Sequence, residues 1–267
     1  MFHMMNYDST MSKPAPYSGT QAVRRAVGLL KAFSEARPEL TLPELVAVSG
    51  LNKTTAFRLL TALAAEGLVA RSEEGAAWRL GPEAIALGAR ALRSSDLRAV
   101  SRPFLEELAR RSGETATIET LVGADVLILG EARSRESLLG APSVGTRWPA
   151  HATSTGKVLL AALPEPTRRS LLRAPLARPA RRTIATLAAL RRELAQVRSH
   201  GYATALGELE DGYNAIGVPV RDHDSRVAAA VSVGGPSARL PLERLRDRLP
   251  ALRRAADGIS RRLGFAG

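Results

Sequence analysis

The chain has 267 residues, 45% of them apolar and 24% charged, so it is long enough for two domains and apolar enough for each to fold around a core. It contains no cysteine, which excludes disulfide bonds, thiolate metal ligands and a cysteine nucleophile and fits a cytoplasmic protein. The formal net charge of +12 favours a nucleic acid partner, yet residues 1–80 carry 9 Lys+Arg against 7 Asp+Glu, so most of the excess lies elsewhere.

The chain begins with a polar leader, residues 1–20, which lacks the apolar core of a signal peptide and predicts a disordered tail. No later stretch approaches the ~18 consecutive apolar residues of a membrane span. A first amphipathic helix is predicted over Gln21–Ala36, ending before Pro38, because the residue before a proline avoids the helical region. Its apolar residues recur at helical spacing: Val23, Ala26, Val27, Leu30 and Phe33.

Two further helices follow in quick succession. Thr41-Leu42-Pro43-Glu44 matches a capping box and predicts a short second helix that stops at Ser49-Gly50. Asn52 then caps a third helix, Lys53–Glu66. One face of this helix is apolar, and the opposite face carries Thr54, Arg58 and Thr61.

Past Gly67, two short strand-like runs, residues 68–71 and 77–80, flank Glu73-Glu74-Gly75 in the pattern of a hairpin. Two helices, a tight turn, a third helix and a hairpin together predict a winged helix-turn-helix domain over residues 21–81. A linker helix is expected over residues 82–95, with the domain boundary at Ser94-Ser95.

The helix-turn-helix prediction implies a DNA interface, since the second helix of such a motif lies in the major groove. Arg58 is the best candidate for reading a base, because a guanidinium can form two hydrogen bonds to guanine. Lys53 and Thr54 are expected to hold phosphate, and the hairpin arginines to reach the neighbouring backbone or minor groove. The candidate DNA-binding residues are Lys53, Thr54, Thr55, Arg58, Thr61, Arg71 and Arg79.

Residues 96–267 predict a second domain of the α+β class, with an antiparallel sheet faced by helices. Helical patterns cover residues 97–111, 155–162, 187–199 and 242–263. Strand-like runs cover residues 116–122, 126–130, 201–206, 215–220 and 227–233. The stretch from Ala174 to Arg182 is expected to be an exposed loop.

Two independent matches, one in each half of the chain, resemble the IclR family of bacterial transcriptional regulators. Residues 42–71, LPELVAVSGLNKTTAFRLLTALAAEGLVAR, are similar to that family's DNA-reading domain. VGTRWPAHATSTGKVLLA, GYATALGELEDGYNAIGVPVRD and AAAVSVGGP, beginning at residues 144, 201 and 228, are similar to its effector domain. The resemblance implies a GAF-like effector domain whose pocket binds a small carboxylate or aromatic compound at the start of the helix near Ser154.

Carried over residue by residue, the resemblance implies an effector site made of Ser154, Thr155, Gly156, Tyr213, Ala215, Ser232 and Gly234. Relatives that bind small keto acids tend to have an acidic residue near Ala205, a thiol near Ala215 and a hydroxyl at Gly234, which this chain lacks. TSTGKVLLA and ELEDG look more like the branch that senses protocatechuate or p-hydroxybenzoate, so an aromatic acid is the expected effector.

The leading hypothesis is therefore a dimeric or tetrameric repressor or activator whose operator affinity responds to an organic acid, without enzymatic activity, cofactor or metal. Two alternatives are a hydrolase that uses the second domain's pocket and a protein that binds nucleic acid non-specifically. The hydrolase lacks a plausible nucleophile, base and orienting acid. His3, His151, His200 and His223 are scattered without metal-ligand spacing.

Overall fold

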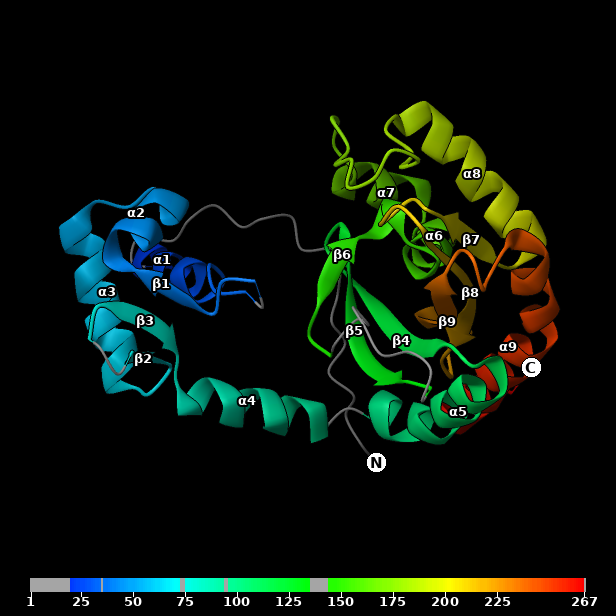
Figure 1. Ribbon diagram of the computed structural model, residues 1–267, viewed down its shortest axis with the longest axis horizontal. Helices are drawn as coiled ribbons and strands as arrows, with labels where there is room; N and C mark the ends of the chain where they lie inside the picture. The colour runs from blue at the N-terminus through cyan, green and yellow to red at the C-terminus, as the bar shows by residue number, and fades with distance from the viewer. Residues whose placement is uncertain (1–19, 35, 73–74, 94–95, 135–143, 267) are drawn as a thin grey trace. The chain divides into compact units, whose positions relative to one another are not determined.

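The computed structural model describes residues 20–266 apart from residues 35, 73–74, 94–95 and 135–143 (Figure 1). The chain divides into two compact units, Met1–Ser94 and Ser95–Gly267, and each is considered by itself. Three predictions fall outside the described residues: the disordered tail up to residue 19, the turn at Glu73-Glu74 and the boundary at Ser94-Ser95.

In its described residues, the first unit contains three helices, a small antiparallel sheet and then a fourth helix. The helices are α1 (Thr20–Leu30), α2 (Leu42–Ser49) and α3 (Lys53–Ala65). The sheet has the order β1-β3-β2, from β1 (Glu39–Thr41), β2 (Val69–Arg71) and β3 (Ala77–Leu80). A fourth helix, α4 (Pro82–Arg93), follows β3. Strand β1, which the sequence analysis missed, pairs with β3 and completes the wing.

Helix α1 ends at Leu30, so the predicted extension to Ala36 is wrong. Ser34 and Arg37 exchange two backbone hydrogen bonds of 3.1 and 3.2 Å, which close a turn that a continuing helix would prevent. Phe33 fits the helical spacing in the sequence because it is buried in the core, although it lies between the end of α1 and that turn. Hydrophobic spacing alone does not show where a helix stops.

The predicted starts of α2 and α3 are confirmed by their capping groups. The Glu44 carboxylate accepts hydrogen bonds from the Thr41 N–H at 2.8 Å and the Thr41 hydroxyl at 2.7 Å. The Asn52 side chain accepts from the Thr55 N–H at 2.8 Å. Gly50 takes the left-handed conformation, φ 66°, that ends α2. These groups fix the short connection between the two helices.

The second unit is built on one antiparallel sheet of six strands in the order β6-β5-β4-β9-β8-β7. The strands are β4 (Thr115–Val122), β5 (Asp125–Ala132), β6 (Arg147–Pro149), β7 (Ala203–Leu206), β8 (Tyr213–Arg221) and β9 (Val227–Pro236). The α+β class predicted for the chain is confirmed. Strand β6 was not predicted; with three residues it is too short to show a period.

Helices cover both faces of this sheet (Figure 1). One face packs against α5 (Asp96–Ser112) and α9 (Leu242–Arg262). The other packs against α6 (Ser154–Ala162), which is preceded by a 3-10 turn, Ala150–Ala152, and contacts α8 (Leu187–His200). A short helix that was not predicted, α7 (Glu165–Leu171), follows α6.

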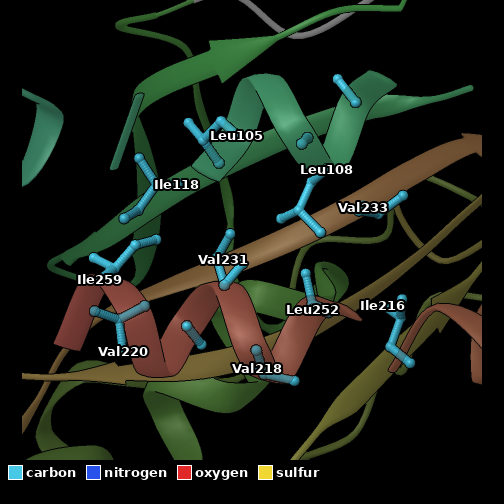
Figure 2. Packing of buried hydrophobic residues seen from close by; sticks show 14 of the residues in the cluster. Leu105, Leu108, Ile118, Ile216, Val218, Val220, Val231, Val233, Leu252 and Ile259 are labelled. Atoms are coloured by element: carbon cyan, nitrogen blue, oxygen red, sulfur yellow. The ribbon is translucent and has the colours of Figure 1, made fainter. Parts of the chain in front are cut away.

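The main core lies between the sheet and the α5–α9 pair. Figure 2 shows Leu105 and Leu108 of α5 and Leu252 and Ile259 of α9 together with aliphatic side chains of β4, β8 and β9. Alternate residues of those strands therefore point away from this core and towards α6. On β4 the residues facing α6 are Thr115, Thr117 and Glu119, all of them polar and buried.

Candidate functional site

Helix α3 presents a polar surface opposite its buried face. Ala56, Leu60 and Leu63 are buried in the first unit's core, whereas Lys53 and Arg58 are exposed. Thr54 and Thr61 are exposed as well, and Thr55 is half-buried beside the Asn52 cap. The Thr61 hydroxyl donates to the Phe57 carbonyl at 2.9 Å. Exposed side chains along one helix are the arrangement that groove reading requires.

The two predicted wing arginines differ in their surroundings. The Arg71 guanidinium donates to the Gly75 carbonyl at 2.8 Å and lies 4.3 Å from the centre of the Trp78 ring. It also lies 5.9 Å from the centre of the Phe57 ring, so it joins the wing to α3. Arg79 is exposed on β3. Phe57, 43% exposed on α3, is an apolar surface residue that the sequence analysis did not single out.

A cavity lies between the α6-facing side of the sheet and the start of α6. Its free volume is about 30 Å³, room for one or two water molecules. The lining mixes hydroxyl groups and one carboxyl with a few apolar side chains. It consists of Thr115, Thr117, Glu119, Trp148, Ala152, Thr153, Ser154, Thr155, Ala205, Leu209, Tyr213, Ala215, Ser232 and Gly234.

The first turn of α6 forms the donor side of this cavity. Thr153 caps the helix by accepting the Gly156 N–H at 3.0 Å. The N–H groups of Ser154 and Thr155 come before the first residue that can bond to a carbonyl within the helix, so they remain available to an acceptor. Glycine is needed at 156, because a Cβ there would lie 2.1 Å from the Ala150 carbonyl oxygen. The helix start therefore offers N–H groups and the positive end of the helix dipole.

The opposite side of the cavity contains Glu119, which is only 3% exposed. Thr117 donates a hydrogen bond to its Oε1 at 2.7 Å, and Thr155 donates to its Oε2 at 2.5 Å. Burial raises the pKa of Glu119 above its ordinary value, and the two threonine hydrogen bonds oppose that shift. The Thr117 hydroxyl is also 2.8 Å from that of Ser232 on the neighbouring strand β9.

The ring of Tyr213 closes the cavity beside Gly234. A Cβ added at Gly234 would lie 2.7 Å from the Tyr213 hydroxyl oxygen, so a larger residue would displace the ring. The pKa of Tyr213 is raised, first by burial and then by the negative charges of Glu119, Glu114 and Glu210. Tyr213 therefore keeps its proton at neutral pH.

The structure brings six of the seven predicted effector-site residues to the cavity lining, the exception being Gly156. Its N–H is taken up by the Thr153 cap. Eight lining residues were missed: Thr115, Thr117, Glu119, Trp148, Ala152, Thr153, Ala205 and Leu209. The alternation of Thr115, Thr117 and Glu119 with Ala116 and Ile118 was a signal in the sequence that one face of β4 is polar.

Next to the cavity, Lys157 of α6 is fully buried between two carboxylates. Its Nζ atom lies 2.8 Å from Glu193 Oε1 on α8 and 2.9 Å from Glu208 Oε1 in the loop after β7. Leu209, the next residue of that loop, lines the cavity. The lysine thus ties α6 and α8 to one wall of the cavity.

Across the described ranges, no group of three or more His, Asp or Glu side chains is placed to hold a metal ion. Within the same ranges, no helix is both long and apolar enough to cross a membrane. His151 is buried, and its Nε2 lies 2.8 Å from the Ala177 carbonyl oxygen.

Family comparisons match both units. The model of the IclR helix-turn-helix domain matches residues 22–73. The model of the bacterial transcriptional regulator IclR C-terminal domain matches residues 89–261. The HTH-type transcriptional regulator XynR of Escherichia coli is 34% identical over 248 residues, covering 92% of this chain and 98% of its own.

Solved structures agree with these matches. A protein of a Silicibacter species described as a putative IclR transcriptional regulator is 32% identical, with a TM-score of 0.82 over 92% of this chain and 97% of its own. An IclR homologue from Microbacterium hydrocarbonoxydans, crystallised with 4-hydroxybenzoate, is 31% identical. Its TM-score is 0.75 over 91% of this chain and 98% of its own.

Proposed function

The chain belongs to the IclR family of bacterial transcriptional regulators, and we propose that an organic acid bound in the cavity beside α6 sets its affinity for an operator. The regulator has a DNA-binding helix-turn-helix domain and an effector-binding domain. The observation that carries the proposal is the cavity itself, whose lining combines the first residues of α6 with buried hydroxyl-bearing residues of the sheet.

In the proposed DNA interface, Arg58 reads a base and Lys53 and Thr54 hold phosphate. Support comes from their exposure on α3, opposite its packed face. Thr55, Thr61 and Arg79 are proposed as flanking contacts. Arg71 is proposed to act at the wing, where its stacking on Trp78 fixes the direction of the side chain.

We expect the effector to be an aromatic carboxylate. A relative at 31% identity was crystallised with 4-hydroxybenzoate, and α6 offers the donors that a carboxylate needs. Cavities that admit benzene are on the order of 150 Å³, several times the free volume here. Binding therefore requires the lining to open, and Leu209 and Trp148 are the large apolar side chains that a ring would displace.

The remaining parts of the proposal follow from this role. The protein is expected to act by binding, without turning over its ligand, in the cytoplasm where the operator lies. A dimer or a dimer of dimers is expected, as is a division into reader (21–81), linker helix (82–95) and effector domain (96–267). The linker part of this proposal is supported by the helix α4 (Pro82–Arg93).

A mobility-shift titration tests the proposal. The probe is the intergenic DNA upstream of the chain's own gene, with a random duplex of equal length as control, at physiological salt. We expect a clear preference for the intergenic probe and a 5- to 150-fold change in affinity, roughly the usual range of coupling, on adding 4-hydroxybenzoate or another small acid. The acid should be recovered unchanged. Equal affinity for both duplexes, with and without the acids, would refute the proposal.

A further inference from the structure

We propose that Glu119 determines the specificity of the cavity and selects an organic acid that carries a hydroxyl group at the end remote from its carboxylate. This inference rests on the proposed function, because it concerns the ligand of the same cavity. Glu119 lies on β4, outside the stretches that resemble the family's effector signatures, and it is the one carboxyl group in the lining.

The surroundings of Glu119 are unusual for a buried carboxyl group. In the described chain its hydrogen-bond partners are two threonine hydroxyls, and no cationic side chain pairs with it. By contrast Glu114, equally buried immediately before this strand, accepts two 2.7 Å hydrogen bonds from the guanidinium of Arg239. A buried acid is costly without such a partner. Because Glu119 is buried without a cation and lines a cavity, its carboxyl group is suited to accept a hydrogen bond from a ligand.

The directions of the hydrogen bonds fix what the cavity offers there. A threonine hydroxyl carries one proton, and Thr117 gives its proton to Glu119. In the 2.8 Å contact between Thr117 and Ser232, Ser232 must therefore be the donor. Ser232, Thr117 and Thr155 thus all direct their protons along a chain that ends on Glu119. With Glu119 ionised, these three hydroxyl groups and the carboxylate leave oxygen lone pairs open to a ligand.

The two sides of the cavity consequently have opposite preferences. The start of α6 supplies N–H donors and suits a carboxylate, whereas Glu119 and Ser232 supply acceptors and suit a hydroxyl proton. Each carboxyl oxygen of Glu119 accepts one hydrogen bond from the protein and has a second lone pair. An acid without a hydroxyl would leave that side desolvated and unpaired, which is a strong basis for rejection.

Matched ligand pairs measure this selectivity by calorimetry on the full chain. The pairs are 4-hydroxybenzoate with benzoate and 4-hydroxybutyrate with butyrate, and 4-methoxybenzoate keeps the oxygen but removes its proton. We expect at least one hydroxy acid to bind about 10-fold or more tightly than its deoxy partner. Methylation should abolish that advantage.

Variants assign the effect to Glu119. Glu119→Ala should bring the ratio of the two dissociation constants close to 1, and Glu119→Gln, which keeps the shape and one acceptor oxygen, should give an intermediate ratio. Glu114→Gln is the matched control, with the same substitution at an equally buried carboxyl group that lies just before β4 and outside the lining, and it should leave the ratio unchanged. If a melting experiment shows that Glu119→Ala does not fold, the ratio of dissociation constants measured for Glu119→Gln alone tests the role of Glu119.

Several outcomes would overturn the inference. The first is that the wild type binds hydroxy and deoxy acids equally tightly, and the second is that it binds neither hydroxy acid. The third is that Glu119→Gln weakens the binding of both members of a pair by the same factor. If benzoate binds as well as 4-hydroxybenzoate and still shifts operator affinity, the proposed function stands without the inference. Loss of operator preference overturns the proposed function whatever the ratio of dissociation constants.

Discussion

Replacing Lys157 by methionine should destabilise the second unit strongly, and by a mechanism that pH can reveal. The ammonium group is fully buried and bonded to Glu193 and Glu208, at 2.8 and 2.9 Å. Methionine fills a similar volume, so the main loss is electrostatic. Two neighbouring carboxylates, 27% and 12% exposed as side chains, would then face each other without a cation.

The magnitude follows from this geometry. Breaking a fully buried ion pair costs about 3–5 kcal/mol, and the partial exposure of Glu193 places the expected loss near the lower end, at about 3 kcal/mol. For a unit of about 170 residues this corresponds to a melting temperature lower by roughly 6–12 °C. The assay follows Trp148 fluorescence in a Trp78→Phe background, since the chain has two tryptophans and Trp148 lies in the second unit.

The pH dependence separates an unpaired charge from a simple packing defect. Burial already raises the pKa of Glu208, against the lowering effect of Lys157, so removing the lysine raises it further. Protonation should then relieve part of the loss at pH 5, and Glu208→Gln added to the variant should restore part of it at pH 8. Lys31→Met, an exposed lysine, is the control. A loss below 2 °C, or one equal at both pH values, would refute the reasoning.

Three further predictions concern single positions. Arg58→Ala should weaken operator binding by ~1–3 kcal/mol in a mobility-shift titration, and unchanged affinity would contradict a base-reading role. Because burial raises the pKa of Glu119 above its unfolded value near 4.5, its contribution to stability is present at low pH and lost as pH rises through the folded pKa. Wild type should therefore lose stability relative to Glu119→Gln in urea unfolding as the pH rises above the unfolded value near 4.5, and a difference that stays constant with pH would count against this. Gly156→Ala places a Cβ 2.1 Å from the Ala150 carbonyl oxygen and should lower the free energy of unfolding by about 1–3 kcal/mol, measured by thermal melting. Gly28→Ala is the control: its Cβ meets no atom within 4 Å, so the variant should be as stable as the wild type or more stable.

Local chemistry explains which parts of the fold were predictable. The starts of α2 and α3 follow from capping groups within four residues of each other, so the sequence contains the whole interaction. The end of α1 depends on backbone hydrogen bonds between Ser34 and Arg37, which leave no mark in side-chain periodicity. Strand β1 depends on pairing with β3, about forty residues later, and a three-residue strand has no pattern of its own.

The cavity was predictable only where the family resemblance covered it. That resemblance named residues at the start of α6 and on β8 and β9, and six of the seven line the cavity. It named nothing on β4, although Thr117 meets Ser232 directly across the β4–β9 pairing. Which strands become neighbours is a property of the sheet order, in which β4 lies beside β9 despite more than a hundred intervening residues.

The cavity has a carboxyl group even though the chain lacks the acidic residue that some relatives have near Ala205. Ala205 lies on β7 and lines the cavity, yet the carboxyl group there comes from Glu119 on β4. Between these two strands lie β9 and β8, so the acid is presented from the opposite part of the same face. A ligand whose carboxylate is bound by the α6 amide groups would therefore meet the acceptor on β4, whereas an acidic residue at position 205 would offer its acceptor from β7. That displacement favours a ligand whose hydroxyl is far from its carboxylate over a two- or three-carbon keto acid.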